Sequence, residues 1–169
     1  MVHAIREKFG SDIPFFTVQL NRHVDATVEK KDDGWGRVKE AQRQAAMGIA
    51  GVFVVPSLDG AVCDVIHNSA AFNLVLGQRL AAQALQYLYG IRSLCDAPNI
   101  VHAEKTEETK IRLTFEHVYE RLDFRKAVPD LIPFVVEDEE GVLTIVSIDA
   151  QDKDIILALN RPLLGKALV

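Results

Sequence analysis

Two residues three positions apart, Asp64 and His67, have the types and the spacing that could do chemistry. A carboxylate beside an imidazole fixes which ring nitrogen carries the proton, and the other ring nitrogen can then accept a proton from a nucleophile. By spacing alone the pair is a weak signal, because an acid that only caps a loop often lies near a surface histidine. The pair predicts a general base with its orienting acid, and the alternative is an ordinary polar loop.

The pair directly precedes a segment, residues 68–90, that has the pattern of an amphipathic helix. Apolar residues recur at helical spacing on one face: Phe72, Val75, Leu76, Leu80, Ala84, Leu85 and Leu88. Asn68 and Ser69 are candidate N-caps, and Gly90 is suited to end the helix in the left-handed conformation. We therefore expect a loop fixed by a well-anchored helix. On it the acid accepts a hydrogen bond from the histidine ring, and the other ring nitrogen faces a groove.

The elements before this loop predict a parallel α/β sheet. Residues 13–20, IPFFTVQL, and 51–56, GVFVVP, are apolar runs typical of strands buried on both faces. Residues 35–47 between them have a helix composition, so the order is strand, helix, strand, helix. Two strands leave both edges open. We therefore expect residues 1–90 to be the edge portion of a larger sheet, with an apolar surface that pairs with another segment or chain.

The pattern changes toward the C-terminus, where only short strands are expected. They fall at residues 100–103, 110–117, 132–137, 143–148 and 154–159. Residues 110–115 alternate polar and apolar side chains, which is the period of a half-buried strand. The sequence thus predicts an α/β domain at residues 1–98 and a small antiparallel β subdomain at 99–169.

Composition sets bounds on the function. The chain has 169 residues, of which 49% are hydrophobic, and a net charge of −5, so it can bury a core of its own. Without a basic stripe, nucleic acid is an unexpected partner. Without an apolar run of ~20 residues, a membrane is unexpected too. The polar, charged stretch at 21–34 is expected to be a loop.

The two cysteines and the N-terminus are less informative about function. Cys63 and Cys95 are expected to be reduced thiols, with a disulfide as the alternative, and their spacing does not fit a metal site. No pattern of a cofactor site is present. The first residues lack the order of a secretory signal. That observation leaves the compartment open and leans toward the cytoplasm.

Several blocks of the chain follow one another in the order of a known family. They are VQL at 18–20, WGRVKEAQ at 35–42, DVIHN at 64–68 and GQRLA at 77–81. With Asn73 and the tail KIRLTFEHV at 110–118, this order resembles the second half of the sialate O-acetylesterase-like carbohydrate esterases, which belong to the SGNH (GDSL-type) hydrolase superfamily. The chain departs from the pattern at Asn68, where proline is frequent, and at Lys39, where arginine is common. Neither departure touches the acid–histidine pair.

The resemblance implies a fold and an activity. The fold would be the C-terminal part of a flavodoxin-like, three-layer hydrolase sheet, followed by the small β unit. The activity would be that of a serine ester hydrolase on O-acetylated carbohydrate of the sialic acid or xylan type, without a cofactor. His67 would be the general base and Asp64 would orient it.

The nucleophile implied by the family is a serine in a Gly-Asp-Ser or Gly-Gln-Ser-Asn block, and no such block stands ahead of residue 13. Ser57 and Ser69 do not match it. We expect Ser57 to be a loop hydroxyl and Ser69 a helix cap. The serine and the oxyanion hole would then lie on an N-terminal segment or a second chain, and this chain alone would be inactive.

A second reading of the chain belongs to another class of function. It is a non-catalytic remnant of a split esterase, kept for carbohydrate binding or for assembly. The sequence leaves open the acyl group, the sugar and the oligomeric state.

Overall fold

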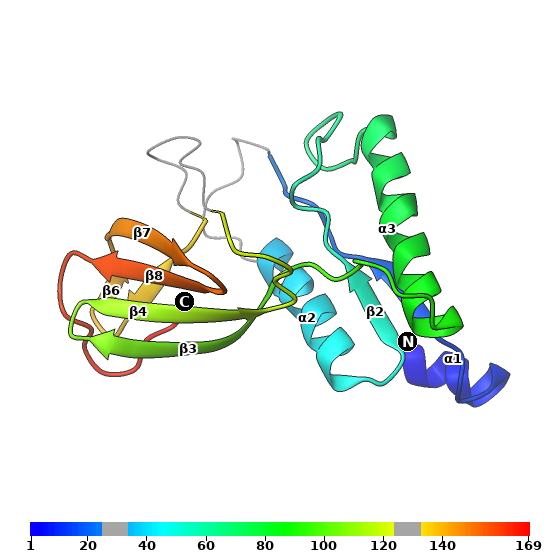
Figure 1. Cartoon of the computed structure of the whole chain (residues 1–169), viewed down its shortest axis with the longest axis horizontal. Helices are drawn as coiled ribbons and strands as arrows, with labels where there is room; N and C mark the ends of the chain where they lie inside the picture. The colour runs from blue at the N-terminus through cyan, green and yellow to red at the C-terminus, as the bar shows by residue number, and fades with distance from the viewer. Residues whose placement is uncertain (25–33, 124–132) are drawn as a thin grey trace. The chain divides into compact units, whose positions relative to one another are not determined.

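The computed structural model describes residues 1–24, 34–123 and 133–169. They divide into two units, Met1–Asp96 and Ala97–Val169, each with its own packing (Figure 1). The polar loop expected at 21–34 lies mostly outside the described residues, and so does the first residue of the strand expected at 132–137. In the part of the chain that is described, no helix is both long and apolar enough to cross a bilayer.

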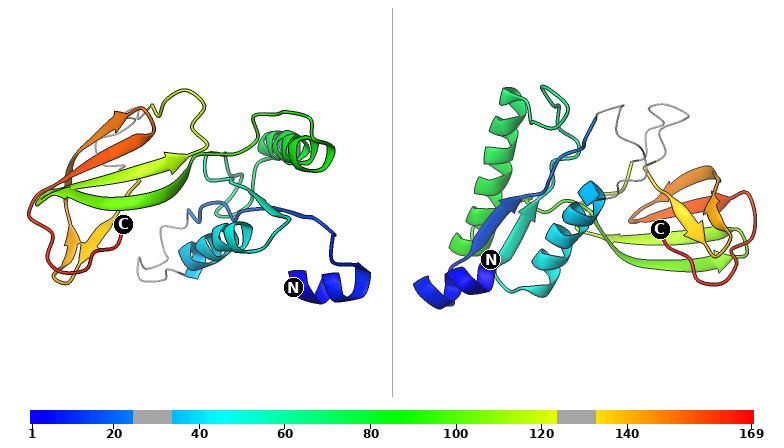
Figure 2. Two further views of the ribbon diagram at one scale, coloured as in Figure 1. Left: turned by 60° about the horizontal axis from the view of Figure 1, so that its bottom comes forward. Right: turned by 180° about the vertical axis from the view of Figure 1, so that it is seen from behind.

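The first unit is a small α/β layer structure. Its elements are α1 (Val2–Phe9), β1 (Phe15–Val18), α2 (Gly34–Gly48), β2 (Val52–Val55) and α3 (Ala70–Tyr89). β1 and β2 pair in parallel, as the sequence predicts, with Phe15 opposite Val52 and Val18 opposite Val55. Helices α2 and α3 lie on opposite sides of this two-stranded sheet (Figures 1 and 2).

Helix α3 begins and ends where its sequence predicts. The Ser69 side chain accepts a hydrogen bond from the backbone N–H of Phe72 at 3.2 Å, which satisfies one of the free donors of the first turn. Gly90 ends the helix in the left-handed conformation, with a φ of 66°. Phe72 and Leu76 are buried against Val55 of β2 and form the core of this unit.

The predicted apolar face of α3 is partly wrong. Val75, Leu85 and Leu88 are exposed, and the third buried residue of the helix is Gln83, which lies one turn after Leu80. The reason is that the helix is apolar on nearly all sides, so hydrophobic periodicity does not single out the stripe that meets the sheet. A sheet of two strands covers only that one stripe.

The expectation that both strands are buried on both faces is also wrong for the described residues. Every residue of β1 is half-buried, and in β2 only Val52 and Val55 are buried. The strands are also shorter than the apolar runs that predicted them. A two-stranded sheet with open edges leaves such runs incompletely covered, because neighbouring strands are what bury the central strands of a parallel sheet.

The second unit is antiparallel. Its main sheet has the order β3-β4-β8-β7, formed by β3 (Asn99–Glu107), β4 (Lys110–Glu116), β7 (Ile145–Gln151) and β8 (Asp154–Leu159). β5 (Val136–Asp138) and β6 (Gly141–Leu143) form a second, two-stranded sheet. Alternate residues of β4 and β8 point into one core, in which Leu113 and Leu157 are fully buried.

Three strand predictions in this unit need correction. Of the strand expected at 132–137, the described residues before Val136 are not strand, and β5 begins at Val136 and extends to Asp138. The strand expected at 143–148 is divided between the end of β6 and β7, and the strand expected at 100–103 extends to Glu107. The extension of β3 depends on its pairing with β4 and not on its own composition, since seven of its nine residues are exposed. Sequence periodicity cannot detect a strand held by backbone pairing alone.

Two glycines of the first unit provide a matched test of how closely Phe72 packs against the loop before α3. A Cβ at Gly60 would lie 1.8 Å from a ring carbon of Phe72, whereas a Cβ at Gly77, in α3, would meet nothing within 4 Å. We predict that Gly60→Ala lowers the free energy of unfolding by about 1–3 kcal/mol through overpacking. Gly77→Ala should raise it by about 0.5–1 kcal/mol through helix propensity. Urea denaturation of both variants is the measurement, and equal effects would contradict the packing of Phe72 on this loop.

Candidate active site

The loop before α3 brings Asp64 and His67 together. Asp64 Oδ2 lies 2.7 Å from His67 Nδ1. The other carboxylate oxygen, Oδ1, accepts hydrogen bonds from the backbone N–H groups of Ile66 at 2.9 Å and of His67 at 2.7 Å. The contact that the sequence predicts is therefore confirmed. The Asp64 carboxylate contacts both the main chain and the ring of His67.

These three donors determine the charge state of the acid. The backbone N–H groups of His67 and Ile66, followed by the His67 ring, lower the pKa of Asp64 to about 2. Each of these hydrogen bonds favours the ionised carboxylate, because a carboxylate accepts better than a carboxylic acid. Asp64 is thus an anion across the pH range in which an imidazole titrates.

An anionic Asp64 sets the tautomer of a neutral His67. The carboxylate only accepts, so the ring must donate from Nδ1, and Nε2 is left as the proton acceptor. The His67 side chain is 70% exposed and that of Asp64 is 50% exposed. No described residue forms a hydrogen bond with Nε2. Such an arrangement can serve as a general base, because its basic nitrogen is open to solvent. The groove expected beside it stays a prediction.

Short backbone contacts hold the loop in shape. Val62 and Asn68 form an antiparallel bridge. Beside it, Cys63 N donates to His67 O and Ser69 N donates to Ala61 O, both at 2.9 Å. Asp64 and His67, called the dyad below, therefore lie on a narrow loop whose two ends are hydrogen-bonded to each other before α3 begins. We call residues 61–69 the dyad loop. Cys63 and Cys95 are both free.

Arg79 ties α3 to the segment that leads into this loop. Its guanidinium donates to the Asp59 carboxylate and to the backbone oxygen of Pro56, and it lies over the Phe72 ring. This pairing lowers the pKa of Asp59. No role for Arg79 is predicted from the sequence, although one signal points to it. It is the only charged residue in a 20-residue helix, and a lone charge on an apolar helix needs a partner.

The two serines near the dyad have structural partners. Ser57 is 0% exposed and its hydroxyl donates to the backbone oxygen of Gln19 at 2.7 Å. Ser69 caps α3, as described above. Both serines therefore have the structural roles that the sequence predicts, Ser57 as a loop hydroxyl and Ser69 as a helix cap. No described serine forms a hydrogen bond with His67.

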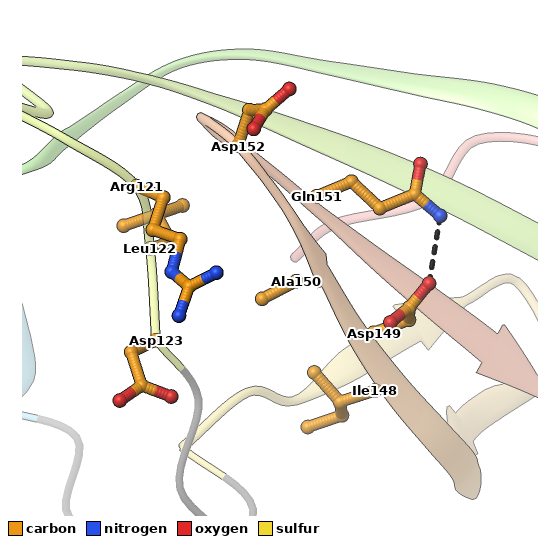
Figure 3. Close-up of a pocket in the computed structure, with 8 residues that line it drawn as sticks. All are labelled: Arg121, Leu122, Asp123, Ile148, Asp149, Ala150, Gln151 and Asp152. Atoms are coloured by element: carbon orange, nitrogen blue, oxygen red, sulfur yellow. Dashed lines mark hydrogen bonds between the residues drawn. The ribbon is translucent and has the colours of Figure 1, made fainter.

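A separate pocket lies in the second unit. It has a volume of about 420 Å³ and is lined mainly by polar side chains, among them Arg121, Asp123, Asp149 and Gln151 (Figure 3). Gln151 donates to Asp149 at 2.7 Å on strand β7. Asp64 and His67 are not among the described residues that line this pocket, which are 121–123 and 148–152.

The backbone hydrogen bonds to Asp64 predict a low pKa for its carboxyl. Its carboxyl should titrate with a pKa of about 2 in ¹³C NMR, and Asp64→Asn assigns the signal. A carboxyl whose pKa is lowered on folding contributes stability above its unfolded pKa of about 3.9, and that stability is lost as the pH falls toward the folded value. In His67→Ala the two backbone donors remain, so the pKa should stay well below the usual range. A return to the usual range in His67→Ala would contradict the dominance of the backbone donors.

Comparison with known proteins supports the fold. No family model matches the chain, and no curated protein does. A carbohydrate acetylesterase from Xanthomonas citri is similar in structure, with a TM-score of 0.74 and 21% sequence identity. The match covers 96% of this chain and 38% of the acetylesterase chain. The chain thus has the mixed α/β fold of part of a carbohydrate acetylesterase and spans well under half of its length.

Proposed function

We propose that this chain supplies the Asp64–His67 part of the catalytic triad of a serine esterase that acts on O-acetylated carbohydrate. The observation that carries the proposal is the 2.7 Å contact between the Asp64 carboxylate and His67 Nδ1, with Nε2 exposed. The structural likeness to a carbohydrate acetylesterase supports the substrate class. Membership of the SGNH superfamily, and a sialic acid or xylan type of substrate, are the finer parts of the same proposal.

The proposed reaction has two steps. His67 Nε2 takes the proton from a serine hydroxyl while the serine oxygen attacks the acetyl carbonyl carbon. The tetrahedral intermediate then breaks its bond to the sugar oxygen, which leaves with the proton from Nε2, and an acetyl-serine remains. Water repeats the sequence in the second step, releasing acetate. Asp64 stays ionised throughout and stabilises the imidazolium that forms in each step.

The nucleophile in this proposal comes from another segment or a second chain. Ser57 is buried and Ser69 caps α3, so neither hydroxyl is available next to Nε2. The chain spans 38% of the similar acetylesterase, which leaves ample room in a protein of that size for a segment with the serine and an oxyanion hole.

The open edge of β1 is where we propose that such a segment adds further strands. Phe15 N donates to Gly51 O, directly before β2, and Gln19 N donates to Val55 O. The backbone groups of Phe16 and Val18 therefore point away from β2. The side-chain amide of Gln42 meets part of this outer edge. It donates to Val18 O at 3.1 Å and accepts from Leu20 N at 2.9 Å, as a neighbouring parallel strand would.

The outer edge of β2 is less accessible. Gln83 donates to the backbone oxygen of Val54, and Arg79 donates to that of Pro56. Proline also lacks a backbone donor. Side chains of α3 thus occupy two acceptors at this edge, whereas at the edge of β1 Gln42 meets only Val18 O and Leu20 N. Together with the donor that proline lacks, this difference favours β1 as the side on which the sheet is extended.

A second candidate function is carbohydrate binding without catalysis, as in a remnant of a split esterase. The observation that favours it is the polar pocket of the second unit (Figure 3). Its carboxylates, amide and guanidinium are groups that can hydrogen-bond to sugar hydroxyls. A carbohydrate that binds this chain with no hydrolysis under any reconstitution would favour this alternative.

The decisive experiment is hydrolysis of an aryl acetate. The isolated chain should show essentially no turnover, because base and nucleophile act as a unit. Co-expressed with a segment bearing the serine block, it should be active. There His67→Ala should lower kcat by several orders of magnitude, and Asp64→Asn should lower it by about 10⁴-fold through loss of the correct tautomer.

Two results would contradict the proposal. One is robust turnover by the isolated chain that a serine-directed reagent blocks, since Ser57 or Ser69 would then need a catalytic role. The other is a reconstituted enzyme in which His67→Ala retains full activity. Gln83→Leu, which changes a buried amide of α3 remote from the dyad loop, is the control for general damage to the fold.

A further inference from the structure

We infer that Asn21 is a positioning residue for the dyad: its buried side chain fixes the loop that carries His67 to the end of β1. The functional meaning of this inference rests on the proposed esterase activity, but the contact itself can be tested in this chain. Asn21 was not among the site residues that the sequence predicts.

The burial of Asn21 is unusual for its type. It follows β1 in a polar stretch, yet it is only 4% exposed. A buried amide must satisfy its donors and acceptors or it costs stability. Its Nδ2 donates to Asn68 Oδ1 at 2.6 Å, across 47 residues of the chain. Asn68 is the residue that directly follows His67.

The orientation of this amide is determined by a second hydrogen bond. Asn21 Oδ1 accepts from the backbone N–H of Arg22 at 2.7 Å. Because that partner is a donor, the oxygen must point toward Arg22, and the –NH₂ group must point toward Asn68. The contact with Asn68 therefore has a defined direction, with Asn21 as the donor and Asn68 as the acceptor.

The main chain of Asn21 is anchored as well. The indole Nε1 of Trp35, in the first turn of α2, donates to Asn21 O. Asn21 is thus held from α2 on one side and holds the dyad loop on the other. This gives Trp35, one of the residues in the family-like blocks, a structural role at the site.

Two further hydrogen bonds join the segment after Asn21 to the dyad loop and to the residue before it. Arg22 Nη2 donates to Gly60 O at 3.0 Å, and Val24 N donates to Val65 O at 2.9 Å. Residues 21–24 therefore follow the dyad loop for most of its length. Asn21 is the buried member of this set, and a buried hydrogen bond is worth more than an exposed one because water does not replace it.

These contacts restrict the orientation of the His67 ring. Asp64 holds the ring at Nδ1 and the main chain at its N–H, while Cys63 N holds the backbone oxygen of His67. With Asn68 fixed by Asn21, the peptide that follows His67 cannot rotate freely. The direction of Nε2 is then determined relative to β1. A general base needs a fixed direction of this kind toward its reactant.

The test is the ring tautomer of His67 in this chain, measured by long-range ¹H–¹⁵N NMR at a pH where the ring is neutral. Wild type should show the Nδ1–H form. Asn21→Leu should lower the ratio of Nδ1–H to Nε2–H about two- to tenfold, the size expected for loss of one net hydrogen bond. Asn68→Ala should do the same without disturbing the end of β1. Asn68→Asp retains the acceptor and should keep the wild-type ratio.

Gln83→Leu is the matched control, because it makes the same kind of change at a buried amide bonded to a strand oxygen. It should leave the tautomer ratio unchanged whatever it does to thermal stability. If Asn21→Leu and Asn68→Ala also leave the ratio unchanged, Asn21 is a structural residue only and the inference is overturned. If Asn21→Leu does not fold, Asn68→Ala alone decides. A wild-type ring without the Nδ1–H preference would instead overturn the dyad, and with it the proposed function.

Discussion

The packing of Phe72 and Leu76 against Val55 is the interaction on which the rest of the first unit depends. It sets the height of α3 over the sheet, and α3 starts only three residues after His67. The Phe72 ring lies so close to Gly60 that no Cβ fits there, so the same side chain also bounds the dyad loop. Hydrophobic burial thus determines where a polar loop begins, and local hydrogen bonds then determine what that loop presents.

How far the sequence predicts this unit depends on the range of each interaction. The Asp64–His67 contact and the Ser69 cap span three residues each, so residue type and spacing suffice to predict them. The parallel pairing of β1 with β2 follows from the order of elements. The bond from Asn21 to Asn68 joins residues 47 positions apart, and no periodicity encodes it. A buried asparagine in a polar stretch looks like any other loop residue until the fold is known.

The dyad has a well-defined geometry but little protection from solvent. Asp64 draws most of its lowered pKa from backbone donors, so its charge does not depend on the histidine ring. The ring itself is largely exposed, and water screens its interaction with the carboxylate. In a complete triad the covering segment would exclude that water and strengthen every charge interaction in the site. The exposure of the Asp64–His67 pair agrees with the proposal that a further segment covers it.

The exposed face of α3 bears on the same proposal through a different property. The helix has one charged residue, Arg79, and its free side carries Leu74 at 74% exposure and Tyr89 at 72% exposure. A helix at a solvent boundary normally places charged residues on the side away from the core. α3 has the composition of a helix covered on two sides, and the described residues leave the side with Leu74 and Tyr89 exposed. A segment that paired with the open edge of β1 and packed beside α3 would bury this face. If that segment also carried the serine, a single partner would complete both the fold and the triad.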